Sequence, residues 1–168
     1  MSLHRRVSIP GIALGLVAAL TVSLVGQGVS PLTGTWKANL AKSKYNPSNV
    51  APKSGTTRFE VTQDSIKTVT DGVDAQGRTT HGEYAARFDG KDYPWKGTID
   101  GRPNPDQDAV AWKKIDNNNY EVTNKLKGQA LTTLRIVIAP DGKSRTNTVT
   151  GKNAQGQTVS NTVVYDKQ

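Results

Sequence analysis

Few side chains in this sequence are able to carry acid–base or nucleophilic chemistry. The chain contains no cysteine, and its two histidines are His4, near the start, and His81. A serine nucleophile would need His81 as its base, and no Gly-x-Ser-x-Gly turn accompanies it. Zinc motifs and the spacing of a calcium-binding EF-hand loop are absent. We therefore expect no catalytic residue, no metal site and no cofactor, with hydrolysis at His81 or acid–base pairing of Glu60 with Glu83 as minor alternatives.

The sequence contains more residues suited to ligand binding than to catalysis. These are arginines and large aromatic residues. Arg58, Arg87 and Arg135 lie in strand-like runs. One of them facing inward would hold an anionic group through two parallel hydrogen bonds, although a solvated outer position is more common. Large aromatic side chains supply the apolar surface that encloses ligands. The alternative is that most of them are simply core residues. The candidate ligand-binding residues are Tyr84, Phe88, Arg87, Trp95, Trp112 and Tyr165.

Short runs rich in Val, Thr, Ile, Tyr and Phe alternate with turn sequences along residues 29–168. Asp74-Ala75-Gln76-Gly77 and Asn153-Ala154-Gln155-Gly156 are two of the turns, because glycine accepts positive φ and Asp or Asn bonds back to the local backbone. The sequence predicts an all-β domain, an antiparallel up-and-down barrel of about 8–10 strands. The strands are expected near residues 34–40, 56–63, 65–71, 79–89, 92–98, 108–115, 119–126, 130–139, 143–151 and 157–166.

Residue alternation assigns an inner and an outer face to several strands, as in an antiparallel sheet with one dry and one wet face. The residues expected to share the inner faces are Tyr84, Ala86, Phe88, Leu134, Ile136, Ile138, Val159, Asn161, Val163 and Tyr165. Two proline-containing segments, 44–54 and 100–108, are expected to lie outside the sheet because proline cannot donate a ladder hydrogen bond.

The N-terminal residues have the pattern of a secretory signal. Arg5 and Arg6 precede an almost wholly apolar run over residues 11–25, and no charged residue follows until Lys37. A signal peptide has an apolar region of about 7–15 residues, whereas a spanning helix needs about 20. We expect a signal helix and signal peptide over residues 1–28, cleaved between Gly26 and Ser30, followed by one domain over 29–168. An uncleaved membrane anchor is the alternative.

Charge and composition limit the cellular locations and binding partners that we expect. Residues 29–168 hold 20 of the 22 Lys and Arg and all 14 acidic residues, so this part carries about +6. The basic residues are scattered, which favours solubility and weak attraction to anionic surfaces rather than nucleic-acid binding. We expect a secreted or periplasmic protein with no stable membrane insertion after cleavage. The composition does not predict the oligomeric state.

Both ends of the predicted barrel resemble a known superfamily. Gly34-Thr35-Trp36 opens the first strand, and the last strand ends in Val163-Val164-Tyr165-Asp166-Lys167. With ten meandering strands, these ends resemble the lipocalin-like, or calycin, superfamily, which includes lipocalins and fatty-acid-binding proteins. Tyr93-Pro94, after Asp89-Gly90-Lys91-Asp92, looks like exported bacterial domains of that superfamily with unassigned roles. The resemblance implies that Trp36 plugs the closed end of the barrel.

The resemblance also implies a function, which is the binding of a small apolar or amphipathic ligand without catalysis. Two departures from the fatty-acid-binding proteins concern that ligand. Val163 stands where those proteins have a carboxylate-binding arginine, and the proline-containing loop over residues 44–54 replaces their helical lid. The alternative function is an exported interaction module whose filled barrel binds anionic envelope polymers or a protein partner through its basic surface.

Overall fold

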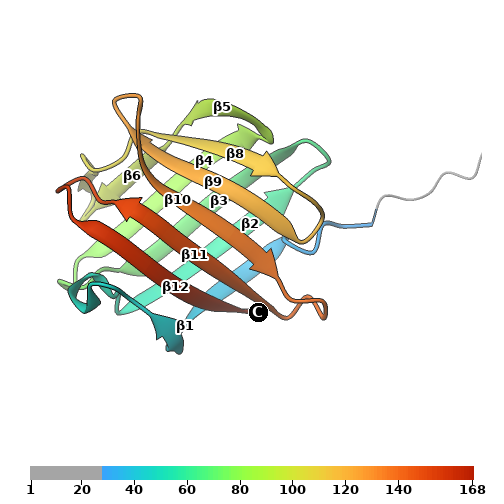
Figure 1. Cartoon of the computed structure of the whole chain (residues 1–168), viewed down its shortest axis with the longest axis horizontal. Coiled ribbons are helices and arrows are strands. Elements are labelled where there is room, and N and C mark those ends of the chain that lie inside the picture. The colour runs from blue at the N-terminus through green and yellow to red at the C-terminus, as the bar shows by residue number, and fades with distance from the viewer. Residues whose placement is uncertain (1–27) are drawn as a thin grey trace, which may run out of the picture.

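The computed structural model describes residues 28–168, which form an antiparallel β-sheet of twelve strands (Figure 1). The predicted signal segment up to residue 27 lies outside the described residues. In residues 28–168 no helix is both long and apolar enough to cross a membrane. The elements are β1 (Gly34–Lys44), the short 3₁₀ helix η1 (Ser48–Val50), β2 (Ser54–Val61), β3 (Ser65–Val73), β4 (Thr79–Arg87), β5 (Asp89–Pro94), β6 (Lys96–Ile99), β7 (Arg102–Pro103), β8 (Ala109–Lys114), β9 (Asn119–Leu126), β10 (Gln129–Ile138), β11 (Ser144–Lys152) and β12 (Thr158–Lys167).

The sheet curls into a half-barrel. Its strand order is β5-β8-β9-β10-β11-β12-β1-β2-β3-β4-β6-β7, so the first and last long strands, β1 and β12, pair in the middle. The right-handed twist of the strands turns the sheet into two layers that cross, with β2–β4 behind β9–β11 in Figure 1. β4 packs against β5 and β8 without joining them in the hydrogen-bonded order. A seam therefore runs between the two ends of the sheet.

The predicted turn chemistry is confirmed at the hairpins. Asp74 Oδ1 accepts hydrogen bonds from the amides of Gln76 and Arg78, both at 2.9 Å, and Gly77 adopts φ 86°. The β11–β12 hairpin repeats this arrangement at Asn153, whose Oδ1 accepts from the amide of Gln157 at 2.8 Å. These local bonds join neighbouring strands in register. The up-and-down connectivity follows from them.

The region around Trp95 differs from the prediction. The expected strand over residues 92–98 is divided into β5 and β6, which lie at opposite ends of the sheet order. This division, with the two-residue β7, raises the count from the expected 8–10 strands to twelve. Pro103 was expected outside the sheet, yet it lies in β7. It is tolerated because β7 is the last strand of the order and its missing N–H leaves no ladder bond broken.

The chain segment before β1 covers one end of the half-barrel. Leu32 and Trp36 are fully buried there, and Trp36 Nε1 donates to the carbonyl of Leu32 at 2.8 Å. Ser30 Oγ lies 3.1 Å from the hydroxyl of Tyr120, and Lys167 Nζ donates to a backbone carbonyl of the same segment at 2.9 Å. Trp36 thus occupies the plug position that the resemblance implies.

An aromatic cluster around Trp112 fills the interior beside this closed end. The Trp112 ring lies 6.1 Å from Phe59 and from Tyr120, 6.2 Å from Phe88 and 6.4 Å from Tyr84, measured between centroids. Pairs of this geometry contribute ~0.5–1.5 kcal/mol each beyond the burial of their area. The predicted inner faces are confirmed, since residues such as Ala86, Ile136, Ile138 and Val163 are buried.

Candidate functional site

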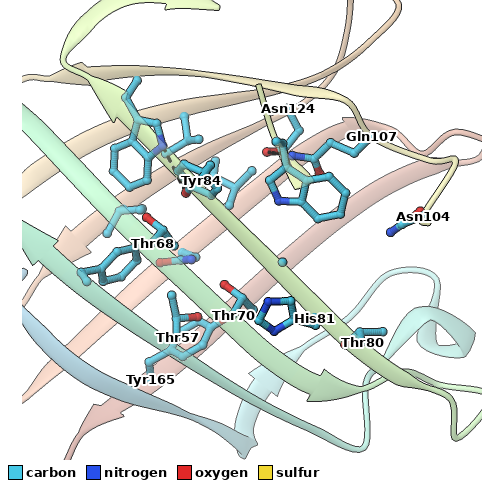
Figure 2. A pocket seen from close by; sticks show the side chains of 18 of the residues that line it. Thr57, Thr68, Thr70, Thr80, His81, Tyr84, Asn104, Gln107, Asn124 and Tyr165 are labelled. Carbon is cyan, nitrogen blue, oxygen red and sulfur yellow. Dashed lines mark hydrogen bonds between the residues drawn. The ribbon is translucent and has the colours of Figure 1, made fainter. Parts of the chain in front are cut away.

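The interior of the half-barrel holds a cavity of about 280 Å³ between the two layers. Its two walls differ in chemistry. Four threonines from β2, β3 and β4 line one wall, which Figure 2 shows from close by. Apolar side chains from β9 and β10, together with aromatic side chains, line much of the remainder. The threonines are Thr57, Thr68, Thr70 and Thr80, and the apolar and aromatic residues include Val122, Leu134, Ile136, Phe59 and Trp112.

Arg145 of β11 projects into this cavity from the inner face of the sheet. Its side chain is only 2% exposed. Nη1 donates to Asn147 Oδ1 at 2.7 Å. The guanidinium carbon lies 3.8 Å from the centroid of the Tyr165 ring and 5.0 Å from that of Phe59, so the cation is held against aromatic faces. The neighbouring β12 supplies Tyr165, which is the cross-strand partner of Arg145.

The charge of Arg145 is not neutralised by a carboxylate. No ion pair among residues 28–168 includes it, and its Nε is buried without a hydrogen-bond partner. Burial lowers the pKa of Arg145 to about 10, which still leaves the group protonated at neutral pH. A buried cation without a counter-charge is strongly unfavourable, because the protein interior solvates charge poorly. The site therefore has a positive charge and a free donor that an anion would satisfy.

Two hydroxyl groups of the cavity add hydrogen-bonding capacity. Thr68 Oγ1 is buried and has no hydrogen-bond partner in the described chain. The hydroxyl of Tyr84 accepts a hydrogen bond from Trp112 Nε1 at 3.2 Å and also lies close to the hydroxyl of Thr68. Burial raises the pKa of Tyr84 to about 12, so the phenol keeps its proton and acts as a donor. Together with Arg145 these groups suit an oxyanion or hydroxyl of a ligand.

The end of the cavity away from Tyr165 is lined by amides (Figure 2). Asn104 and Gln107 come from the segment after β7, and Asn124 comes from β9. Gln107 Nε2 donates to Asn124 Oδ1 at 3.2 Å, and Asn124 Nδ2 donates to the Thr132 hydroxyl at 3.1 Å. Trp95 lies at this same end, because it lines a second hollow together with Asn104 and Gln107. The cavity thus has a cationic end, an amphipathic middle and an uncharged polar end.

The structure brings four of the six predicted ligand-binding residues to the cavity. Tyr84, Trp95, Trp112 and Tyr165 line it. Phe88 shares their face of the sheet, but it packs on Trp112 and Tyr120 and is not part of the cavity lining.

Arg87 points to the outside of the sheet, where it pairs with Asp64 at 2.6 Å and is 61% exposed. The prediction that Arg87 contacts the ligand is therefore wrong. Side chains alternate between the two faces of a strand, so Arg87 lies on the outer face while its neighbours Ala86 and Phe88 lie on the inner face. The other two arginines considered, Arg58 and Arg135, are exposed as well.

The residues considered for catalysis do not assemble an active site. His81 lies at the rim of the cavity, with Nδ1 2.7 Å from Asp71 Oδ1, and both side chains are exposed. Glu60 is exposed and pairs with Arg58, while Glu83 is exposed on β4. In residues 28–168 no group of three His, Cys, Asp or Glu side chains is placed to hold a metal ion.

Sequence reasoning missed Arg145. The strand over 143–151 has threonine and other polar residues on both faces, so its alternation does not say which face is inner. A signal was nevertheless present in the β10–β11 hairpin. Ile138 is the register partner of Arg145, and cross-strand partners share a face of the sheet. Because Ile136 and Ile138 were expected inside, Arg145 could have been placed inside with them.

Comparison with known proteins supports the fold. No protein-family model and no curated protein matches this sequence. The zebrafish ileal bile acid-binding protein, in complex with cholic acid, superposes with a TM-score of 0.50 at 14% identity, covering 83% of this chain and 100% of that one. A redesigned β-barrel, mFAP0, bound to DFHBI, gives a TM-score of 0.42 at 14% identity over 82% of this chain and 99% of its own. The chain therefore shares its fold, an antiparallel β half-barrel, with the zebrafish bile acid-binding protein.

Proposed function

We propose that this protein is an exported, non-enzymatic binding protein for a small amphipathic organic anion, which it holds inside the half-barrel. The observation that carries the proposal is Arg145, a buried cation in a cavity with no carboxylate partner. A protein that kept this charge for stability alone would be expected to pair it. An anionic ligand supplies the missing partner.

The cavity suggests how the ligand is oriented. Its anionic group lies against Arg145 on the side of the Thr68 and Tyr84 hydroxyls, and its apolar body lies between the threonine wall and the wall around Ile136. A volume of about 280 Å³ is just below the usual range for small-molecule sites, which favours a small ligand. The zebrafish protein of similar fold is complexed with cholic acid, an amphipathic acid, which agrees with this ligand class.

The alternative of an interaction module with a filled barrel predicts a packed interior. The cavity and the unpartnered Nε of Arg145 favour the ligand-binding proposal instead. Export rests on the N-terminal sequence pattern described above, and it would bring the protein into contact with external or envelope-derived small molecules.

The experiment is displacement of the fluorescent anion 1-anilinonaphthalene-8-sulfonate from the delipidated mature domain by dodecanoate and by its methyl ester. We expect dodecanoate to displace the probe better than the ester does. Arg145→Gln should weaken dodecanoate by about 10- to 150-fold, since hydrogen bonds to charged groups are worth ~1.5–3 kcal/mol. Arg87→Gln removes an exposed arginine of the same type and should change nothing. Equal displacement by acid and ester, or an unchanged Arg145→Gln variant, would contradict the proposal.

A further inference from the structure

Trp95 stands where the chain crosses the seam between the two ends of the sheet. The residue before it, Pro94, pairs with Ala109 of β8, and the backbone N–H of Trp95 donates to the carbonyl of Asp108 at 2.9 Å. The residue after it, Lys96, pairs with Glu83 of β4. Trp95 thus links two sheet ends that share no continuous ladder at this point, and its backbone is held from both sides.

The indole of Trp95 lies flat on a pair of glycines. Gly82 of β4 and Gly97 of β6 are register partners. A Cβ added at Gly97 would lie 1.9 Å from the Trp95 ring, and one added at Gly82 would lie 2.9 Å from it. Any larger residue at Gly97 would collide with the ring. The two glycines therefore form a floor without side chains on which the indole is seated.

The same indole lies between the interior cavity and a second hollow. An outer groove of about 450 Å³ is lined by β6, Pro103 of β7 and the segment that follows. Four residues line both the groove and the interior cavity: His81, Trp95, Asn104 and Gln107. The two spaces are therefore adjacent, and the large side chain seated between them is Trp95.

We infer that Trp95 determines the size of the ligand by capping the interior cavity at its amide-lined end. The inference rests on the proposed function, because it concerns the far end of a ligand whose anionic group is held by Arg145. With the indole seated on Gly82 and Gly97, the apolar body ends within the 280 Å³ cavity. Removing the ring joins this space to the outer groove, so that longer apolar chains become acceptable.

A length series of saturated fatty acids from about 8 to 18 carbons tests the inference, with each acid displacing the same naphthalene sulfonate probe. In the wild-type domain, affinity should rise about fourfold for each methylene that is buried, and then stop rising at one chain length. Trp95→Ala should move that break to longer acids by several carbons, with at least a tenfold gain for the longest ones. The shortest acids should bind both proteins equally well.

Two further variants keep the test decisive. Lys96→Ala removes a side chain that lines the outer groove but not the interior cavity, so its break should stay at the wild-type length. If Trp95→Ala has no cooperative thermal transition, Trp95→Leu replaces it, with a smaller move of the break expected. An unchanged break in a folded Trp95 variant overturns the inference and leaves the proposed function intact. If no acid of any length binds the wild-type domain, the proposed function itself fails.

Discussion

Replacing Arg145 with methionine should stabilise the ligand-free domain. Arginine and methionine are long, flexible side chains, so the interior remains filled while the buried charge disappears. Replacement of buried charged groups by apolar residues of similar volume is often stabilising by ~1–4 kcal/mol. The change also removes the group that we propose as the anion anchor. Stability of the empty protein and affinity for the anion should therefore move in opposite directions.

The magnitude follows from the environment of the guanidinium. Burial lowers the pKa of Arg145 to about 10, and the difference from the ordinary pKa of arginine corresponds to ~3 kcal/mol of unfavourable free energy for the charged form. The contacts with the rings of Tyr165 and Phe59 and the hydrogen bond to Asn147 are lost in the variant and offset part of this. A net gain of about 1–2 kcal/mol remains.

Thermal and urea unfolding of the delipidated domain measure this gain. For a domain of this size, 1–2 kcal/mol raises Tm by about 3–8 °C. Arg87→Met is the matched control, because Arg87 is exposed and its pair with Asp64 is worth about 0–1 kcal/mol. If Arg145→Met is less stable than the wild type by more than ~1 kcal/mol, the buried guanidinium is a net structural contributor. The premise that it awaits an anion would then be refuted.

The stability difference between wild type and Arg145→Met should also depend on pH. Because the pKa of Arg145 is lowered on folding, the unfavourable free energy of burying its charge is fully present below about pH 10. Above that pH the folded protein releases the proton while the unfolded chain still holds it. The wild type therefore gains stability relative to the variant. A difference that is constant from about pH 6 to 9 and shrinks above about pH 10 is the expected result.

Two further predictions concern the packing of the cavity. Gly97→Ala should destabilise the domain by about 1–3 kcal/mol in urea unfolding, because the new methyl group would overlap the indole of Trp95. Gly55→Ala is the control and should be close to neutral, because its Cβ would lie 3.7 Å from the nearest atom. Tyr84→Phe should lose about 1–3 kcal/mol by leaving Trp112 Nε1–H without its acceptor; a Tm equal to that of the wild type would show that this hydrogen bond contributes nothing.

Local sequence patterns were sufficient for most of the fold. The hairpin turns at Asp74 and Asn153 are encoded within four or five residues, and the alternation through Leu134, Ile136 and Ile138 assigns their strand a buried face. Both signals act between near neighbours in the chain, so they can be read without knowing the tertiary structure. The division of the strand at Trp95 could not be read in this way. It depends on which sheet end each side of Trp95 joins, and both partners, β4 and β8, are distant in the sheet.

The candidate site was predicted only in part. Large aromatic residues such as Tyr84 and Trp112 stood out by their type and proved to line the cavity. The arginine prediction placed Arg87 at the ligand and overlooked Arg145, because a polar strand gives no hydrophobic pattern by which to orient it. The role of Gly82 and Gly97 as the seat of an indole was also out of reach, since it is a contact between a side chain and the backbones of two strands.

The sequence by itself determined the all-β class, the turns, most strand positions and the inner faces, because each depends on local backbone preferences and on the period of two along a strand. The tertiary structure alone decided that Arg145 is buried among aromatic rings without a carboxylate, and that Trp95 separates the cavity from the outer groove. Burial and pairing of a charge depend on groups from strands that are far apart in sequence, so no local pattern records them. The same two features now define the proposed ligand, a small amphipathic anion with an apolar body of limited length.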